Sequence, residues 1–184
     1  MQVSQQYTFK IVTTGPESSG KSIMAEALAQ HFKTSWAPEF ARSYLNHLGR
    51  PYTRIDLAGI AKGQQSWEQW YARQGNDLYF CDTDWTVLQV WEHFRFGLPE
   101  NGNWVWATGY AHPQPANWYF LCAPDFPWQA DPLRENPYQR EILFDWYEDI
   151  LNERSGGYTV LRGPHDKRLE QAISQVTKLF TPLR

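Results

Sequence analysis

Cysteine and methionine are both scarce in this chain, with two of each among 184 residues. Two cysteines, Cys81 and Cys122, are too few for the disulfide framework of a small secreted scaffold. A large excess of charge of one sign is also missing, because the formal net charge is only -3. Proteins that coat a polyanion need clustered Lys and Arg. The charge balance therefore argues against a nucleic-acid partner.

Long apolar runs are absent as well. No run approaches the roughly 20 residues that a membrane-spanning helix requires. The N-terminus, MQVSQQYTFK, lacks the basic-then-apolar layout of a signal peptide. The five histidines show no zinc-ligand spacing, and the nucleophile elbow of serine hydrolases is missing. We therefore expect a cytoplasmic protein without membrane association.

Aromatic residues, in contrast, are abundant, with ten each of Trp, Tyr and Phe. Such a content excludes intrinsic disorder, and the length predicts one domain over residues 1–184. Core filling alone seldom requires ten tryptophans in a chain of this length. Trp67, Trp70 and Trp146 lie on expected helices and are predicted to pack. The residues that concentrate in the middle of the chain are Trp85, Trp91, Trp104, Trp106, Tyr110, Trp118 and Trp128.

Short apolar segments alternate with helical patterns along the sequence. The expected strands are 7–14, 34–37, 78–81, 118–122 and 158–161; the expected helices begin near 20, 39, 56, 85, 138 and 166. Strands that are apolar on both faces and separated by helices predict a parallel α/β sheet covered on both sides. Residues 101–116 are expected to be irregular, and the proline-rich segment 124–140 is expected to form a lid. Ligands of such sheets bind beyond the carboxyl ends of the strands.

The strongest motif follows the first strand, where GPESSGKS satisfies G-x-x-x-x-G-K-[ST] in full. Glycines let successive backbone N–H groups point inward and cradle phosphates, and the following helix adds its positive end. Lys21 is expected to reach the β- and γ-phosphates, and Ser22 to bind Mg²⁺ through its hydroxyl. The alternative is a Gly-rich turn with an exposed lysine. The predicted nucleotide-binding residues are Gly15, Pro16, Glu17, Ser18, Ser19, Gly20, Lys21 and Ser22.

Acidic residues follow the expected strand 78–81. Asp82 is predicted to orient Mg²⁺, and Asp84 to contact the substrate hydroxyl or act as a base. For both carboxylates the alternative is capping of the helix that begins at Trp85. Glu39 and Arg42 lie three residues apart on one helix face, which favours substrate or phosphate contacts; a solvated ion pair is the alternative.

Three further arginines are assigned by position. Arg134 and Arg140 flank the expected lid and would neutralise charge on the transferred phosphoryl group while water is excluded. Arg168 follows the last strand, where an adenine ring would lie, and stacking on that ring is predicted. Ordinary surface charge is the alternative for all three.

Taken together, the motifs GPESSGKS, PEFAR, GQQ, CDTDW and PWQADPLRENPYQRE resemble the NadR-type ribosylnicotinamide kinase domain. The resemblance covers residues 9 to 179 and implies an adenylate-kinase-like, three-layer P-loop NTPase with five parallel strands. It implies ATP- and Mg²⁺-dependent phosphorylation of nicotinamide riboside to nicotinamide mononucleotide, a step of NAD salvage. Pro38 stands where the family often carries an aromatic, so Trp36, Trp85 or the Trp104 region is expected to stack on the acceptor ring.

Two other functions stay open from the sequence. One is a kinase for another nucleoside or small alcohol, and the other is a P-loop ATPase that works as a nucleotide-dependent switch. The oligomeric state, including a homo-oligomer, is also open.

Overall fold

A five-stranded parallel sheet forms the centre of the protein, as seen in a computed structural model that describes residues 9–109, 115–154 and 156–180. The strand order is β2-β3-β1-β4-β5, and every neighbouring pair is parallel. The strands are β1 (Phe9–Thr14), β2 (Trp36–Ala37), β3 (Leu78–Asp82), β4 (Trp118–Cys122) and β5 (Gly157–Leu161). The predicted strands are therefore present; the first two residues of the expected strand 7–14 lie outside the described part.

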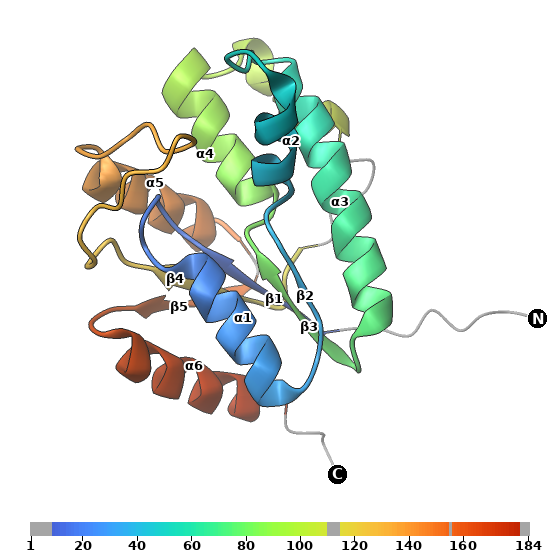
Figure 1. Cartoon of the computed structure of the whole chain (residues 1–184), viewed down its shortest axis with the longest axis vertical. Helices are drawn as coiled ribbons and strands as arrows, with labels where there is room; N and C mark the ends of the chain where they lie inside the picture. Colours follow the sequence, from blue (N-terminus) through green and yellow to red (C-terminus); the bar gives the residue numbers. More distant parts are fainter. Residues whose placement is uncertain (1–8, 110–114, 155, 181–184) are drawn as a thin grey trace, which may run out of the picture.

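Helices cover both faces of this sheet and complete a three-layer arrangement (Figure 1). The helices are α1 (Lys21–Phe32), α2 (Phe40–Leu48), α3 (Asp56–Gln74), α4 (Trp85–Phe96), α5 (Arg140–Asn152) and α6 (His165–Phe180). Helices α1 and α6 pack on one face, and α2, α3, α4 and α5 pack on the other. The predicted α/β fold class is confirmed.

Side-chain alternation along the strands explains why both faces must be covered. Ile11 belongs to the core under α1 and α6, whereas its neighbour Val12 belongs to the core under α3, α4 and α5. In β4, Phe120 faces the first core and Leu121 the second. All four side chains are fully buried. A strand that buries successive residues on opposite faces is stable only inside such a sandwich.

The segment between α4 and β4 packs against helices α3 and α4. It contains two short 3₁₀ helices, Glu100–Gly102 and Trp106–Gly109. The buried Glu92 carboxylate of α4 accepts the N–H groups of Val105 and Trp106, both at 3.1 Å. Gly109 lies so close to the backbone of Ala58 in α3 that a Cβ atom would meet its carbonyl oxygen at 1.8 Å. The expected irregular excursion is thus partly ordered, and its residues 110–114, Tyr110 included, lie outside the described part.

Met24, Ala25, Leu28 and Ala29 form the buried face of α1, whereas Ile23 is 63% exposed. One packing prediction is wrong. Trp70 was expected to pack, yet it is 54% exposed on α3. Within the described ranges, no helix is both long enough and apolar enough to cross a bilayer.

Candidate nucleotide and acceptor site

The loop after β1 has the geometry of an anion cradle. Gly15 and Gly20 both adopt positive φ angles, 135° and 83°, which glycine reaches without steric cost. A Cβ atom on Gly15 would also lie 2.6 Å from the carbonyl oxygen of Cys122. Helix α1 begins directly after Gly20 and directs its N-terminal end at the loop. The sequence motif and the local backbone therefore agree.

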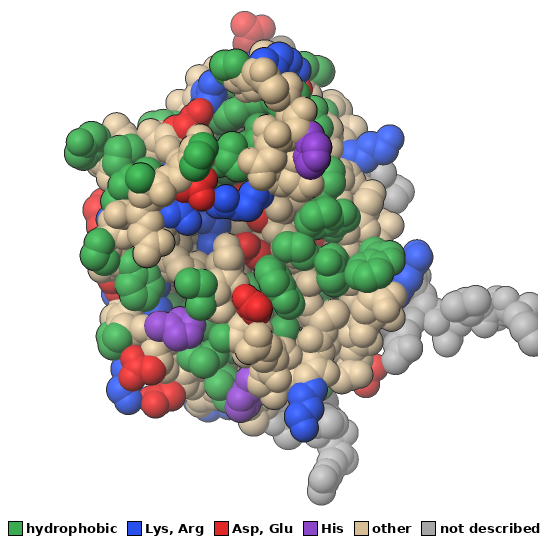
Figure 2. Space-filling model, viewed as in Figure 1, with side chains coloured by type: hydrophobic (Ala, Val, Ile, Leu, Met, Phe, Trp, Pro, Cys, Tyr) green, Lys and Arg blue, Asp and Glu red, His purple; other side chains and the backbone are tan. Residues whose placement is uncertain are grey.

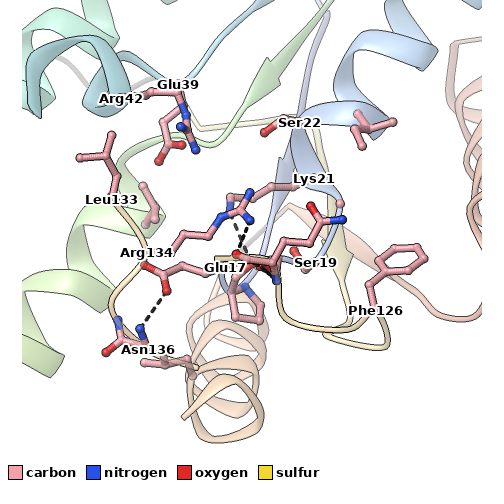
Figure 3. Close-up of a pocket in the computed structure, with 18 of the residues that line it drawn as sticks. Glu17, Ser19, Lys21, Ser22, Glu39, Arg42, Phe126, Leu133, Arg134 and Asn136 are labelled. Carbon is pink, nitrogen blue, oxygen red and sulfur yellow. Dashed lines mark hydrogen bonds between the residues drawn. The ribbon is translucent and has the colours of Figure 1, made fainter. Parts of the chain in front are cut away.

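A pocket of about 310 Å³ opens over this loop and continues toward α2, α4 and α5. The whole loop 15–22 lines it (Figure 3). Basic side chains gather at a hollow on this face of the molecule (Figure 2). The cationic residues that line the pocket, apart from His165, are Lys21, Arg42 and Arg134. The loop end of the pocket is thus suited to a polyphosphate.

Asp82 ends β3, where the metal-binding carboxylate was predicted; like Asp84 it is not among the residues that line the pocket. Its side chain is buried, and its Oδ1 atom has no hydrogen-bond partner in the structure. Burial raises the pKa of Asp82; the nearby Glu39 charge also raises it, whereas Lys21 and a hydrogen bond from Ser22 lower it. Mg²⁺ prefers oxygen ligands, and the Asp82 carboxylate, with one oxygen that accepts no hydrogen bond, lies next to the Ser22 hydroxyl. These residues therefore fit the implied metal ion.

Asp84 does not line this pocket, in contrast to its predicted contact with the substrate. It is fully buried and caps α4, accepting a hydrogen bond from Thr86 N at 2.8 Å. The Tyr119 hydroxyl donates to its other oxygen at 2.8 Å. The Arg154 guanidinium in turn donates to that tyrosine oxygen at 2.6 Å. The capping alternative describes Asp84 in this structure, because its oxygens are engaged inside the protein.

Glu39 and Arg42 both line the pocket. Glu39 is the N-cap residue of α2, so β2 and the start of α2 place it at the carboxyl edge of the sheet. Arg42 lies one turn further on and donates to the Asp131 carboxylate at 2.9 Å. Both side chains face the loop residues in Figure 3. The start of helix α2 therefore brings one carboxylate and one guanidinium to the site.

The irregular segment 124–139 covers the loop and closes the pocket on one side. Arg134 extends from it toward Lys21 (Figure 3) and donates to Gln129 O at 2.7 Å. The backbone N–H of Asn136 donates to the Glu17 carboxylate at 3.0 Å, and that of Glu135 donates at 3.1 Å. Burial raises the pKa of Glu17, and these N–H bonds oppose that rise.

Arg140, the second predicted lid arginine, is not among the pocket-lining residues. It begins α5 and donates to the Phe126 carbonyl oxygen at 2.8 Å. Its guanidinium also faces the Trp128 ring at 6.0 Å. Arg140 therefore contacts the covering segment 124–139 through Phe126 and Trp128 and does not face the pocket.

The aromatic residues of the pocket are not the ones expected. Trp36 lies in a separate surface hollow beside Trp70. Trp85 stacks on Trp106 with ring centroids 5.2 Å apart, and Arg154 covers it at 3.7 Å. Neither indole reaches the pocket, because β2 and α4 direct them elsewhere. The Trp104 region packs against the core under α3 and α4.

Other aromatics line the pocket instead: Trp91 of α4, Tyr147 of α5, and Phe126 and His165 near the loop. Trp91 shares a helix face with Val87, four residues earlier, and both line the pocket. That spacing is the signal in the sequence from which this lining was predictable. Leu45, Leu133 and Leu143 complete an apolar compartment.

Arg168 is also placed differently from the prediction. It does not line the pocket and is only 1% exposed. Its guanidinium donates to four backbone or side-chain oxygens within the protein. Direct stacking on a bound adenine is therefore incompatible with this arrangement.

A phosphate cradle at the end of β1, an acid at the end of β3 and a covering segment that places Arg134 at the pocket define a P-loop kinase fold. The AAA domain family (AAA_28) matches residues 10–168. The chain belongs to this family.

Comparison with solved structures supports the same fold. A NadR protein in complex with NR superposes with a TM-score of 0.77 at 18% identity, covering 94% of this chain and 50% of that chain. A deoxyadenosine kinase from M. mycoides superposes with a TM-score of 0.64 at 10% identity, covering 92% of this chain and 100% of that one. The neighbours thus include both a NadR protein and a nucleoside kinase.

Among curated proteins, the trifunctional NAD biosynthesis/regulator protein NadR of Escherichia coli (strain K12) is 33% identical over 84 residues. That match covers 44% of this chain and 20% of the relative's length. The NadR protein of Salmonella typhimurium gives the same identity and coverage. The sequence resemblance to NadR-type domains is therefore confirmed, although the matched region spans only a fifth of those proteins.

Proposed function

We propose that this protein is an ATP- and Mg²⁺-dependent kinase that phosphorylates the 5′-hydroxyl of nicotinamide riboside. The observation that carries the proposal is the continuity of one pocket. It runs from the phosphate cradle, past Glu39 and Arg42, into an apolar compartment bordered by Trp91 and Tyr147. A nucleoside base fits such an apolar compartment, and a ribose hydroxyl would then face the cradle.

Charge in the pocket supports in-line phosphoryl transfer. The transition state is loose, so catalysis rests on positioning and on neutralising the equatorial oxygens. Lys21 and Arg134 extend toward each other in the pocket (Figure 3), so both cations would contact a γ-phosphoryl group bound between them. Ser22 and Asp82 would hold Mg²⁺, which supplies charge neutralisation across the β- and γ-phosphates when bound.

Glu39 acts in the step in which the acceptor hydroxyl attacks the phosphoryl group. The ribose 5′-oxygen attacks phosphorus, and the bond from phosphorus to the β-bridging oxygen breaks to release ADP. Glu39 lines the acceptor side and accepts the hydroxyl proton, directly or through one water. The covering segment 124–139 excludes bulk water, which would otherwise compete as acceptor.

The experiment mixes protein, MgATP and a nucleoside panel that includes nicotinamide riboside, and measures ADP release. Release stimulated by nicotinamide riboside above all other nucleosides is expected. Lys21→Ala should abolish turnover, whereas the control Lys62→Ala, an exposed lysine on α3, should keep it. Preference for another nucleoside would overturn the acceptor assignment while leaving a kinase. Slow ADP release that no acceptor stimulates would instead favour the nucleotide-dependent switch.

A further inference from the structure

The Arg168 guanidinium is the most heavily engaged buried cation among the described residues, and it lies directly behind the nucleotide end of the pocket. Its Nη1 atom donates to the carbonyl oxygen of Ser19, in the phosphate cradle, at 2.9 Å. Its Nη2 atom donates to Ala123 O and to Asp125 Oδ2, both at 3.0 Å. Its Nε atom donates to Gly163 O at 2.7 Å. One side chain therefore joins the cradle, the end of β4 and the loop before α6.

The same guanidinium lies beneath an aromatic ring that does line the pocket. Its central carbon is 4.4 Å from the centroid of the Phe126 ring. A Cβ atom built on Gly20 would approach that ring to 3.0 Å, so the ring lies against the end of the cradle. Phe126 therefore offers an aromatic face where the phosphate end of the pocket passes into the region of His165.

We propose that Arg168 is a positioning residue for nucleotide binding, which fixes the phosphate cradle through Ser19 and supports Phe126 as the platform for the base. Arginine suits this task because its planar fork serves several acceptors at fixed angles. A cation this deeply buried needs all of these acceptors. The proposal depends on the ATP-binding part of the proposed function and is independent of the acceptor's identity.

The two halves of the proposal are separable by ligand. Titrations of the full chain with MgATP report on both cradle and platform, and titrations with magnesium tripolyphosphate report on the cradle alone. Arg168→Met should weaken both ligands at least about tenfold, the effect expected from losing a charge-assisted hydrogen bond that orders the cradle. Phe126→Leu should weaken MgATP but leave tripolyphosphate binding unchanged.

The matched control is Lys167→Met, which removes an exposed cation from the neighbouring position of the same helix. Its affinity for both ligands should equal that of the unmodified protein. Arg168→Lys keeps a buried cation but lacks the fork, so it should recover thermal stability without recovering tripolyphosphate affinity. This variant decides the matter if Arg168→Met fails to fold.

Three results overturn the inference. One is normal affinity for both ligands in a folded Arg168 variant, which would leave Arg168 a purely structural residue. Another is restored tripolyphosphate affinity in Arg168→Lys. The third is equal weakening of both ligands by Phe126→Leu. Failure of the unmodified protein to bind MgATP would contradict the proposed function itself, and the two failures are therefore distinguishable.

Discussion

Lys10→Met tests the buried ion pair between β1 and α3. The Lys10 ammonium lies 2.7 Å from Glu68 Oε2, and the two side chains are only 3% and 5% exposed. Removing one partner of such a pair typically costs about 3–5 kcal/mol in the free energy of unfolding, because a desolvated charge is left behind. For a chain of this size, that cost lowers Tm by roughly 6–20 °C.

The assay is urea denaturation followed by circular dichroism, applied to a double-mutant cycle. Lys10→Met/Glu68→Leu should recover most of the loss, since two apolar side chains of similar volume replace the pair. Lys167→Met removes one partner of an exposed pair, with side chains 63% and 67% exposed, and should leave the midpoint unchanged. A Lys10→Met loss below about 1 kcal/mol, or a double mutant no more stable than the single one, would refute this account of the buried pair.

Three further predictions concern the pocket. Gly15→Ala should weaken MgATP binding at least about tenfold in a titration, because its Cβ would meet the Cys122 carbonyl oxygen and the required φ is positive. A backbone N–H and then the Arg42 guanidinium hold the pKa of Asp131 below its usual range. The ionised Asp131 carboxylate therefore stabilises the covering segment above the ordinary aspartate pKa, and this stabilisation is lost as the pH falls through the lowered pKa of Asp131. In Arg42→Ala the pKa of Asp131 is lowered less, so limited proteolysis should detect the loss at a higher pH than in the unmodified protein. Glu17→Ala removes the carboxylate that binds two backbone N–H groups of the segment, so ADP release without acceptor should rise; an unchanged rate would contradict its role in closure.

Much of the fold was predictable because short-range patterns determine it. Apolar residues on both faces of 118–122, for example, require covering layers on both sides, and the structure has them. The cradle was predictable for the same reason, since GPESSGKS encodes its own backbone conformation. Glu39 and Arg42 both line the pocket, and their contacts with substrate or phosphate stay a prediction.

Long-range placement accounts for the rest. The direction of Trp85 depends on Trp106, which lies 21 positions further along the chain and stacks on it. Burial of Arg168 depends on acceptors from two distant segments, one that contains Ser19 and one that contains Ala123 and Asp125. Neither relation leaves a local periodic signal in the sequence. The predicted ligand contacts of Trp85 and Arg168 therefore failed because their actual partners lie far away in the sequence.

The sheet ends in two very different edges, and this difference bears on aggregation. Strand β2 contains only Trp36 and Ala37, and Pro38 follows at once, so this edge offers little backbone for a further strand. Strand β5 forms the other edge with five residues, Gly157–Leu161, whose outer backbone groups have no strand partner within the described sheet. Strand addition during partial unfolding should therefore begin at β5, where a lysine in place of Thr159 would act as a gatekeeper.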